Sequence, residues 1–319
     1  MHRETILRRL CQAGPVSGES LARELGVSRT AVWKYIRKLR QQGYQIISSP
    51  RVGYQLADSS DILLLEDIQK EVTGNWQVQL RAEVDSTQEV LRTLARKGAE
   101  EGLVLVAERQ TLGRGRLGRK WLSPHGGIYF SILLRPAAPP WTLLRLPLIA
   151  GVAVAETVQE ISTLQCTLKW PNDVFVRAKK LAGILCEIDA EVDMVNHVIL
   201  GIGLNVNNEI AEELRQQATS MRQECGTSFS RAACLGQLLN RLETYYLAFR
   251  GGQVDPLLEK WRQLSSTLGS EVVVSSPGDC IEGKAVDIDK DGALLVRRAS
   301  DDTLVRILAG DVSLKTISE

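Results

Sequence analysis

The feature that most constrains this chain is residues 108–121, which read E-R-Q-T-L-G-R-G-R-L-G-R-K-W. Three glycines alternate there with the basic residues Arg114, Arg116, Arg119 and Lys120. Glycine lets the backbone bend sharply and come close to a ligand, and guanidinium groups suit phosphate and carboxylate groups. The stretch therefore predicts a loop that binds an anion and becomes ordered when it does so.

Two common nucleotide-binding motifs match this loop only in part. The G-x-G-x-x-G spacing from Gly113 is that of the dinucleotide fingerprint, which needs a following helix and an acidic residue about 20 positions on. No acidic residue follows Glu108 until Glu156, and residues 127–134 have the apolar pattern of a strand. The Gly-Lys-Ser/Thr of a P-loop is also missing. A solvated basic loop without a ligand is the simpler alternative, but seven basic residues in this acid-free stretch disfavour it.

Four further motifs accompany the glycine-arginine loop in a fixed order. They are D-S-T (residues 85–87), K-W-P-N-D (169–173), K-L-A-G-I-L (180–185) and G-I-G-L-N (201–205). With G-R-G-R-x-G-R-x-W, this set resembles the biotin protein ligases over essentially the whole chain. Because a helix-turn-helix pattern stands in front, the chain looks like the bifunctional form, a ligase that also represses the biotin operon.

The resemblance implies site residues. Those expected to bind biotin are Ser86, Thr87, Gln110, Gly113, Arg114, Arg116, Lys180, Gly183 and Gly203. Those expected to bind ATP are Arg116, Trp121, Asn172, Lys180 and Asn205. Lys180, Arg114 and Arg116 are the expected catalytic cations, with Lys180 contacting both the biotin carboxylate and the α-phosphate. Asp173 is the candidate for Mg²⁺, which would bridge the ATP phosphates.

Each assignment has a structural alternative. Asp85 or Ser86 could do no more than cap the helix that follows. Asn172 and Asp173 follow a proline that ends a strand, where turn chemistry alone explains them. Trp121 could be an apolar wall of the ligand site or a core residue, since tryptophan is often largely buried. Gln88 replaces an Asn found in many family members, so its role is the least certain.

The first sixty residues have the pattern of a winged helix-turn-helix. They hold ten Lys/Arg against four Asp/Glu, although the whole chain has a net charge of only +1. Helical spacing is expected in residues 4–11, 17–25 and from Ser28 onward, with Ser28 as an N-cap and Gly26 as a turn. Residues 44–47 and 54–56 would pair as the wing.

The third of these helices is expected to enter the major groove of DNA. The residues that would reach base edges are Arg29, Thr30, Trp33 and Lys34. Those that would contact phosphates are Arg37, Lys38, Arg40 and Arg51. The alternative is a three-helix interaction module with a solvated basic face, because such patterns remain hypotheses until a groove contact is seen.

The fold class expected is α/β (α+β) in three domains. Residues 1–60 would form the winged helix, 61–268 a mixed-sheet ligase domain resembling the class II synthetases, and 269–319 an SH3-like β-barrel. Expected elements of the ligase domain are helices over 61–72, 86–97, 146–161 and 231–250, and a strand over 164–168. An acidic turn at residues 287–292 starts like an EF-hand but has Arg298 at its twelfth position, so calcium is excluded.

Composition excludes several other classes. No apolar signal segment follows Met1, and the longest apolar run, residues 146–155, is shorter than the roughly 20 residues that span a bilayer. Six scattered cysteines without C-x-x-C read as reduced thiols, and three isolated histidines argue against zinc. We therefore expect a cytoplasmic protein without a membrane partner.

The activity implied by the resemblance is a two-step ligation. Biotin and ATP would form biotinyl-5′-AMP, and a lysine of the biotin carboxyl carrier protein would then take the biotin. The adenylate-bound form is expected to dimerise and to bind operator DNA. Three alternatives remain: a ligase that does not repress, a biotin sensor without catalysis, and a lipoate-type ligase of related fold.

Overall fold

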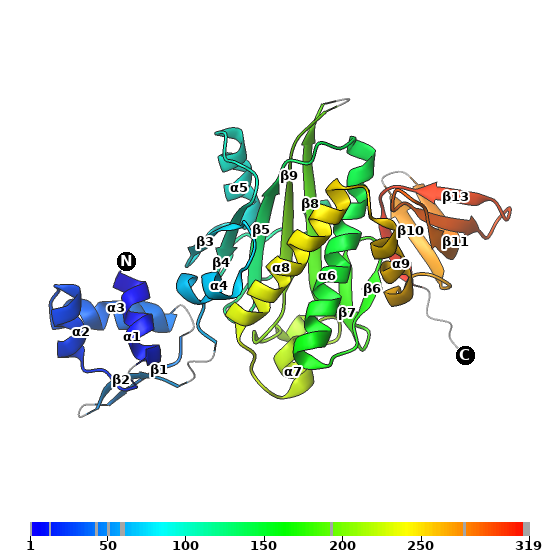
Figure 1. Ribbon diagram of the computed structural model, residues 1–319. Helices are drawn as coiled ribbons and strands as arrows, with labels where there is room; N and C mark the ends of the chain where they lie inside the picture. The colour runs from blue at the N-terminus through cyan, green and yellow to red at the C-terminus, as the bar shows by residue number, and fades with distance from the viewer. Residues whose placement is uncertain are drawn as a thin grey trace.

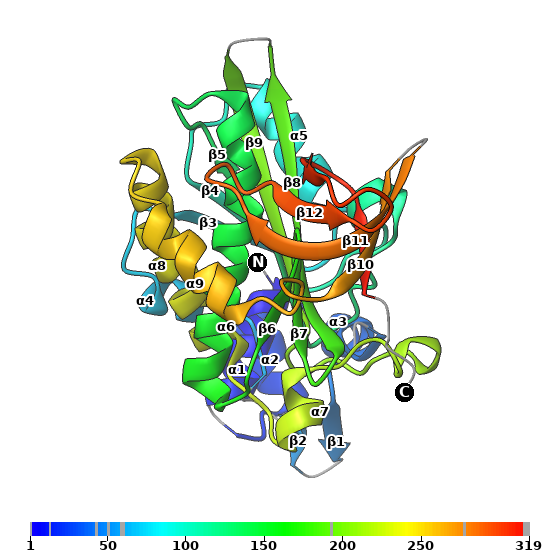
Figure 2. The ribbon, with the colours of Figure 1, turned by 90° about the vertical axis from the view of Figure 1, so that its right-hand side faces the viewer.

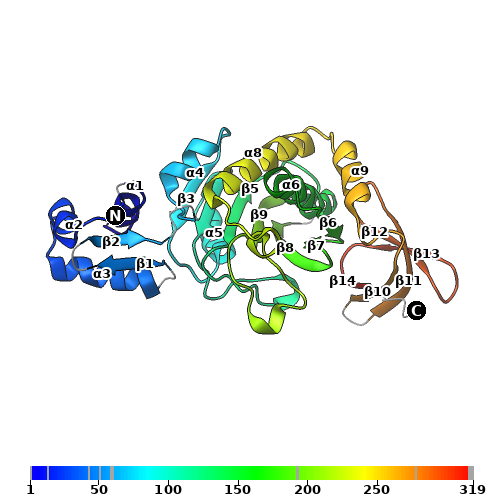
Figure 3. The same ribbon diagram turned by 90° about the horizontal axis from the view of Figure 1, so that it is seen from below.

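The computed structural model describes residues 2–12, 14–41, 44–49, 52–57, 61–191, 194–276 and 279–314. It has three parts in a row, with the N-terminal and C-terminal parts on opposite sides of a central sheet (Figures 1 and 3). Each part is a continuous stretch of chain, so the elements follow one another in sequence order.

Three helices and a hairpin form the N-terminal part. α1 (His2–Gln12), α2 (Gly18–Leu25) and α3 (Arg29–Gln41) precede β1 (Ile46–Ser49) and β2 (Gly53–Leu56), which pair antiparallel. Ser17 Oγ accepts a hydrogen bond from Ser20 N–H at 3.0 Å, and Ser28 Oγ accepts one from Ala31 N–H at 3.2 Å. These are side-chain N-caps, and Gly26, with φ 65°, ends α2. The expected winged helix is confirmed.

Seven strands form the central sheet in the order β3-β4-β5-β9-β8-β7-β6. They are β3 (Gln77–Arg81), β4 (Leu103–Ala107), β5 (Ile128–Leu134), β6 (Thr167–Lys169), β7 (Asp173–Val176), β8 (Lys179–Ala190) and β9 (Val195–Leu204). β3 and β4 pair parallel and the other neighbours antiparallel. The sheet is therefore mixed, as expected.

Helices cover both faces of this sheet. α5 (Thr87–Arg96) packs on one face, against Leu105, Leu133 and Ile199. α6 (Arg145–Ser162) and α8 (Arg231–Arg250) pack on the other, with α4 (Leu65–Glu71) and α9 (Asp255–Leu264) beside them (Figure 1). Successive side chains of a strand point to opposite faces, so a strand covered on both faces such as β5 is apolar at every position except Ser131.

The segment Pro140–Ser162, which comprises the short helix η2 (Pro140–Leu144) and α6, is long and apolar enough to cross a membrane by length and composition alone. Most of it is buried, against the sheet, α8 and α9. This is the buried helix across the sheet that the sequence predicts, and the core helix of a globular domain meets the same criterion.

Five strands form the C-terminal part: β10 (Glu271–Ser276), β11 (Asp279–Ile288), β12 (Leu294–Arg298), β13 (Leu304–Ile307) and β14 (Asp311–Leu314). They form one antiparallel sheet in the order β13-β12-β11-β10-β14, which faces the viewer in Figure 2. In the described residues β13 and β14 are edge strands, so the expected barrel is seen here as a five-stranded sheet.

Three expected elements begin at least two residues later than the sequence pattern indicates. The first wing strand, expected over residues 44–47, is β1 (Ile46–Ser49), and the other two elements lie in the central part. α4 begins at Leu65 rather than at residue 61, because Ile62, Leu63 and Leu64 are extended and buried between two cores. β6 covers Thr167–Lys169 rather than residues 164–168, and Leu164 and Cys166 pack in the core before it. In both cases apolar residues that look like part of an element serve as buried connections.

Candidate active site

Two adjoining cavities lie where the glycine-arginine loop crosses β8 and β9. The smaller has a volume of about 130 Å³ and the larger about 1110 Å³. Ser131 and Gly201 are cross-strand partners that line the smaller cavity, on the face of the sheet that carries α5. Residues that line both cavities are Gln110, Arg119, Lys120, Trp121, Asp173 and Lys180.

The smaller cavity holds buried polar atoms that have no hydrogen-bond partner among the described residues. They are Ser86 Oγ, Gln88 Oε1 and Trp121 Nε1. Burying such atoms unpaired is costly, so they indicate a polar ligand. Ser86 stands at the N-cap position of α5 but its hydroxyl makes no capping bond. The reading of Ser86 as merely a helix cap is therefore wrong.

Thr87 and Gln110 tie the start of α5 to the loop. Gln110 Oε1 accepts the Thr87 N–H at 2.8 Å, and its Nε2 donates to Ser123 Oγ at 2.9 Å. The hydroxyls of Thr87 and Ser131 lie 2.7 Å apart. Ser131 is not among the residues predicted from the motifs, and its only signal in the sequence is that it is a serine inside the otherwise apolar run of β5.

Trp121 forms the wall between the cavities. Gly183 and Gly203 are cross-strand partners, and the indole lies directly over them. A Cβ added at Gly203 would come within 2.4 Å of Trp121 Nε1, and one added at Gly183 within 3.0 Å of the same ring. Glycine at both positions therefore lets the indole lie against the sheet, half-buried and lining both cavities, and its contact with a ligand stays a prediction.

Lys180 lies at the junction of the two cavities. Its Nζ is 2.7 Å from Asp173 Oδ1 and 5.4 Å from the centre of the Trp121 ring. In the antiparallel pairing of β7 and β8, Asp173 is opposite Gly183 and Lys180 is opposite Phe175, so the Lys180 side chain extends along the strand pair to reach the Asp173 carboxylate. The ammonium group is thus available to anions in either cavity.

The three loop arginines have different surroundings. Arg116 donates to Asn172 Oδ1 at 3.2 Å, and burial lowers the pKa of its guanidinium. Arg114 lies at the other end of the smaller cavity, where it pairs with Glu89 and, at 3.3 Å, with Glu187. The structure therefore places Arg116 beside Asn172 and within electrostatic reach of Asp173, and it keeps Arg114 paired with carboxylates.

Arg119 connects the loop to the C-terminal part. Its guanidinium pairs with Asp311 of β14 at 2.5 Å, and Asp311 also lines the smaller cavity. The ion pair with Arg119 lowers the pKa of Asp311. Nothing in the sequence around Asp311 indicates this contact, because the two residues are 192 positions apart.

Two predicted site residues, Gly113 and Asn205, have a clear structural role in holding loops near the cavities. A Cβ on Gly113 would meet Trp121 O at 2.3 Å, so this glycine permits the loop to fold back on itself. Asn205 lines the larger cavity, but its Nδ2 donates to Thr219 O at 3.0 Å and its Oδ1 accepts from Asn208 at 3.1 Å. Its amide therefore holds the polar loop of residues 206–226, which contains η3 (Glu212–Leu214) and α7 (Met221–Cys225).

A magnesium ion fits the site only with substrate present. Among the described residues no group of three or more His, Cys, Asp or Glu side chains could hold a metal. Mg²⁺, however, is usually bound through one or two carboxylates together with substrate phosphates and water. The single carboxylate of Asp173, beside the larger cavity, is compatible with that arrangement.

A second candidate site lies on α3. Val32, Ile36 and Leu39 are buried, and Arg29, Thr30, Trp33 and Lys34 are on the exposed side, where Trp33 is 49% exposed. The Arg37 guanidinium lies over the Trp33 ring at 5.6 Å.

The expected phosphate contacts differ in their availability. Arg37 and Lys38 are exposed. Two nitrogens of Arg40 donate to Ile46 O, at 2.8 and 2.7 Å, so this side chain anchors the wing. Arg51 lies outside the described residues.

Family comparisons match all three parts of the chain. The biotin/lipoate A/B protein ligase family matches residues 81–205, an HTH domain matches residues 2–55, and the biotin protein ligase C terminal domain matches residues 267–315.

Whole-length relatives carry both ligase and repressor in their names. The Bifunctional ligase/repressor BirA of Bacillus subtilis (strain 168) is 35% identical over 322 residues, covering 98% of both chains. The protein of that name from Escherichia coli (strain K12) is 31% identical, covering 94% of this chain and 93% of the relative.

A further relative matches a shorter part of the chain and is named as a ligase alone. The Biotin--[acetyl-CoA-carboxylase] ligase of Mycobacterium tuberculosis is 36% identical over 75% of this chain and 90% of its own length.

A solved structure of similar fold contains both small substrates. It is the biotin protein ligase from Aquifex aeolicus in complex with biotin and ATP, with a TM-score of 0.65 and 37% identity. The alignment covers 75% of this chain and 98% of that one.

Proposed function

The chain belongs to the family of bifunctional biotin protein ligase/repressors, and from that premise we propose that it biotinylates a lysine of a carrier protein and represses transcription. One observation carries the ligase proposal. A lysine ammonium group, Lys180, stands where a small cavity with unpaired polar atoms meets a much larger one. Two anionic substrates of unequal size would meet at that point.

The small cavity suits the bicyclic head of biotin. A ureido group carries two N–H donors and a carbonyl acceptor, and the cavity offers Ser86 Oγ and Gln88 Oε1 as unpaired partners. The hydrogen bond between Thr87 and Gln110 holds the first turn of α5 in place beside this cavity. The valeryl chain would then extend along Gly203 and the Trp121 ring and bring its carboxylate to Lys180.

The first step is proposed to join two anions. A carboxylate oxygen of biotin attacks the α-phosphorus of ATP, the bond to the bridging oxygen breaks, and pyrophosphate leaves. Repulsion between the reactants opposes this step, so positioning and fixed cations supply most of the catalysis. Lys180, which lines both cavities, and Arg116, which lines the smaller one, are the cations proposed for this role. Asp173 would hold Mg²⁺, which would supply further positive charge to the phosphates.

The second step transfers biotin to the carrier. The amine of the acceptor lysine attacks the acyl carbon of biotinyl-5′-AMP, the bond from that carbon to the phosphate oxygen breaks, and AMP leaves. The amine loses a proton to solvent in the same step. No covalent enzyme intermediate is required, and the biotin carboxyl carrier protein is the partner proposed.

The repressor proposal rests on α3 and on the loops. The exposed face with Arg29, Thr30, Trp33 and Lys34 would read the operator in the major groove. Biotinyl-5′-AMP would order the glycine-arginine loop and the loop of residues 206–226, and would favour a homodimer that binds two half-sites. A ligand that biases one order–disorder equilibrium shared by two sites couples them.

Labelling of an acceptor domain tests the enzyme class. The purified acceptor is incubated with this protein and MgATP plus either biotin or lipoate, and its mass is measured. A biotin-sized gain only with biotin and ATP is expected, whereas a gain with lipoate would assign the lipoate-type activity. Operator binding with and without the adenylate then separates the bifunctional protein from a ligase that does not repress.

A cytoplasmic location goes with this proposal. ATP and the carrier protein are intracellular reactants, and Cys166 and Cys234 are buried thiols. Burial raises the pKa of both thiols to about 12, so they are unreactive as nucleophiles.

A further inference from the structure

A buried cluster of charged and polar side chains joins the N-terminal part to the glycine-arginine loop. Its centre is Glu108, the first residue of loop 108–121, which is only 2% exposed. Arg231 Nη1, at the start of α8, donates to Glu108 Oε2 at 2.9 Å. The hydroxyl of Tyr44, from the N-terminal part, donates to Glu108 Oε1 at 2.7 Å and accepts from Arg3 at 2.6 Å. One carboxylate thus has partners from both parts.

The same cluster holds the far end of the loop. Arg231 Nη1 also donates to Gly127 O, at 3.0 Å. His125 Nε2 lies 3.3 Å from Glu108 Oε2, and the His125 ring meets the Tyr44 ring edge to face with centroids 4.6 Å apart. Glu108 follows β4 and Gly127 precedes β5. Tyr44 therefore contacts a residue near each end of the connection between β4 and β5, residues 108–127, which contains the glycine-arginine loop and which we call the ligand loop.

The linker between the parts reinforces this contact. Ile62 and Leu64 pack in the core of the N-terminal part, whereas Leu63 between them packs in the core of the central sheet. Asp61 O accepts from Arg231 Nη2 at 2.7 Å. Rotation of one part against the other would pull a side chain out of one core, so we expect the two parts to move together with the loop ends.

Charge balance makes Tyr44 the informative member of the cluster. Removal of Arg231 would leave a buried carboxylate without its counter-ion, which is strongly destabilising. Removal of the Tyr44 hydroxyl leaves Glu108 paired with Arg231 and leaves the aromatic ring in place. It deletes the hydrogen bond to Glu108 and the one that Arg3 donates to the same hydroxyl, and it leaves Arg3 Nη2 3.9 Å from Glu108 Oε1.

We propose that Tyr44 is a positioning residue for the ligand loop, acting through Glu108, and that it carries the state of the loop to the DNA-binding helix. The second half rests on the proposed function, because it needs a ligand and an operator. The first half does not. If ordering of the loop changes the affinity of the N-terminal part for DNA, then DNA binding changes the stability of the ordered loop by the same free energy.

The positioning is tested by amide hydrogen exchange on the ligand-free, full-length protein. The N–H of Gly115 donates to Arg119 O at 2.7 Å and that of Trp121 to Gly113 O at 2.9 Å, so both amides report on the loop. In Tyr44→Phe we expect their exchange to be about tenfold faster, the value of one hydrogen bond to a charged group. Tyr54→Phe in β2 is the matched control and should exchange like the wild type. Equal exchange in all three proteins would overturn the positioning role.

The transmission is tested with ligands. In Tyr44→Phe the dissociation constant for biotin should rise about tenfold while kcat at saturating biotin stays within about twofold, because bound substrate orders the loop. The ratio of operator affinities with and without biotinyl-5′-AMP should fall towards one. If the ratio of operator affinities is unchanged in Tyr44→Phe while the loop amides exchange faster, Tyr44 positions the loop but does not carry its state to the DNA-binding helix. A wild-type protein that labels no acceptor would refute the proposed function, and the exchange data would still decide the positioning.

Discussion

Lys180 Nζ lies 2.7 Å from Asp173 Oδ1, at the point where the two cavities meet. The pairing keeps a cation in place between the two cavities. The ammonium group also lies 5.4 Å from the centre of the Trp121 ring. Several predictions about catalysis and binding depend on this geometry.

Loss of the Lys180 ammonium group should slow adenylation. Lys180→Ala is expected to reduce the single-turnover rate of pyrophosphate release by about 10²–10³, as for other fixed groups that stabilise transition-state charge. Lys179→Ala is the control, because successive residues of β8 point to opposite faces. A Lys180→Ala rate equal to that of Lys179→Ala would show that the lysine has no catalytic role.

A side chain at Gly203 should close the ligand site. The Cβ of Gly203→Ala would come within 2.4 Å of Trp121 Nε1, so the indole must leave its position between the cavities. We expect biotin to bind at least about tenfold more weakly by calorimetry, the effect of losing roughly 1.4 kcal/mol. Gly151→Ala in α6, where the nearest atom is 3.5 Å away, should bind normally. Normal binding by both variants would contradict the position given to Trp121.

Removal of the Ser86 hydroxyl should separate binding from stability. The hydroxyl is buried without a hydrogen-bond partner among the described residues, so Ser86→Ala should leave the free energy of unfolding unchanged or slightly raise it. Biotin affinity should fall about three- to tenfold, the value of one hydrogen bond. Ser270→Ala, which removes a hydroxyl that donates to Ser266 O, should lower the free energy of unfolding and leave biotin affinity unchanged. Reduced stability without weaker binding in Ser86→Ala would refute the ligand contact.

Acid should weaken the cluster at the base of the loop. Burial lowers the pKa of His125 to about 4, although Glu108 opposes the shift. Because this folded-state pKa is below the unfolded value of about 6.5, the unfolded chain takes up the proton first as the pH falls. Stability is then lost between about pH 7 and pH 4, by up to roughly 3 kcal/mol.

The carboxylate of the cluster contributes in the same direction. Burial alone would raise the pKa of Glu108, but Arg231, His125, Tyr44 and Arg3 together lower it. A group with a lowered folded-state pKa contributes stability at higher pH, and that stability is lost as the pH falls.

Urea unfolding tests the contribution of His125. The free energy of unfolding of His125→Asn should fall less steeply between pH 7 and 5 than that of the wild type or of His2→Asn. Identical slopes would argue that His125 is not buried neutral.

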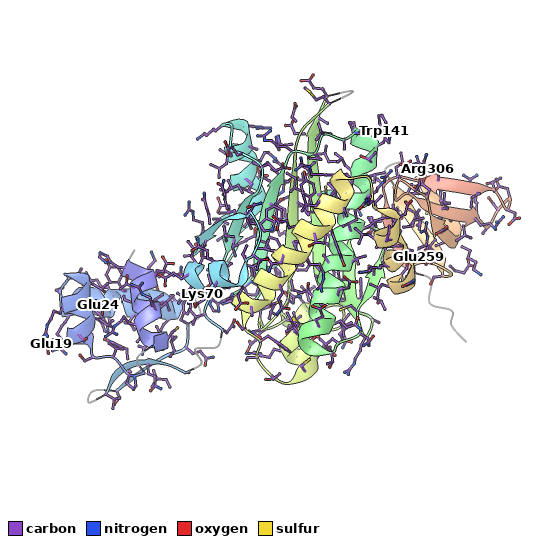
Figure 4. All side chains as sticks on the ribbon, viewed as in Figure 1. Glu19, Glu24, Lys70, Trp141, Glu259 and Arg306 are labelled. Atoms are coloured by element: carbon purple, nitrogen blue, oxygen red, sulfur yellow. The ribbon has the colours of Figure 1, made fainter. Side chains whose placement is uncertain are left out.

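Two basic residues of α3 should affect operator binding differently. Arg29→Ala should cost about 1–3 kcal/mol at the cognate operator and relax the preference at one base pair. Lys38→Ala should weaken binding to all sequences alike and reduce the salt slope by about one. Lys70→Ala on α4, on the central part in Figure 4, is the control. Loss of affinity by that variant would place the DNA elsewhere.

Local patterns predicted most of the secondary structure because they depend on neighbouring residues. Ser17, Gly26 and Ser28 define the ends of helices in the N-terminal part, and each does so through contacts within five positions. The Arg231–Arg250 helix agrees with its pattern at both ends. Where apolar residues served as connections instead, as at Ile62 and Leu164, the same pattern placed an element too early.

The sequence by itself determined the glycine-arginine loop, the winged helix and the motif residues near the two cavities, because motifs and helical spacing are written in short stretches. Only the tertiary structure decided that Ser131 and Asp311 line the smaller cavity, that Trp121 lines both, that Ser86 does not cap its helix, and that Arg114 is paired with carboxylates. Contacts such as Tyr44–Glu108, 64 positions apart, and Arg119–Asp311, 192 apart, have no local signal. They arise because packing the cores brings distant chain segments together, and a buried charge is stable only where such a segment supplies its partner.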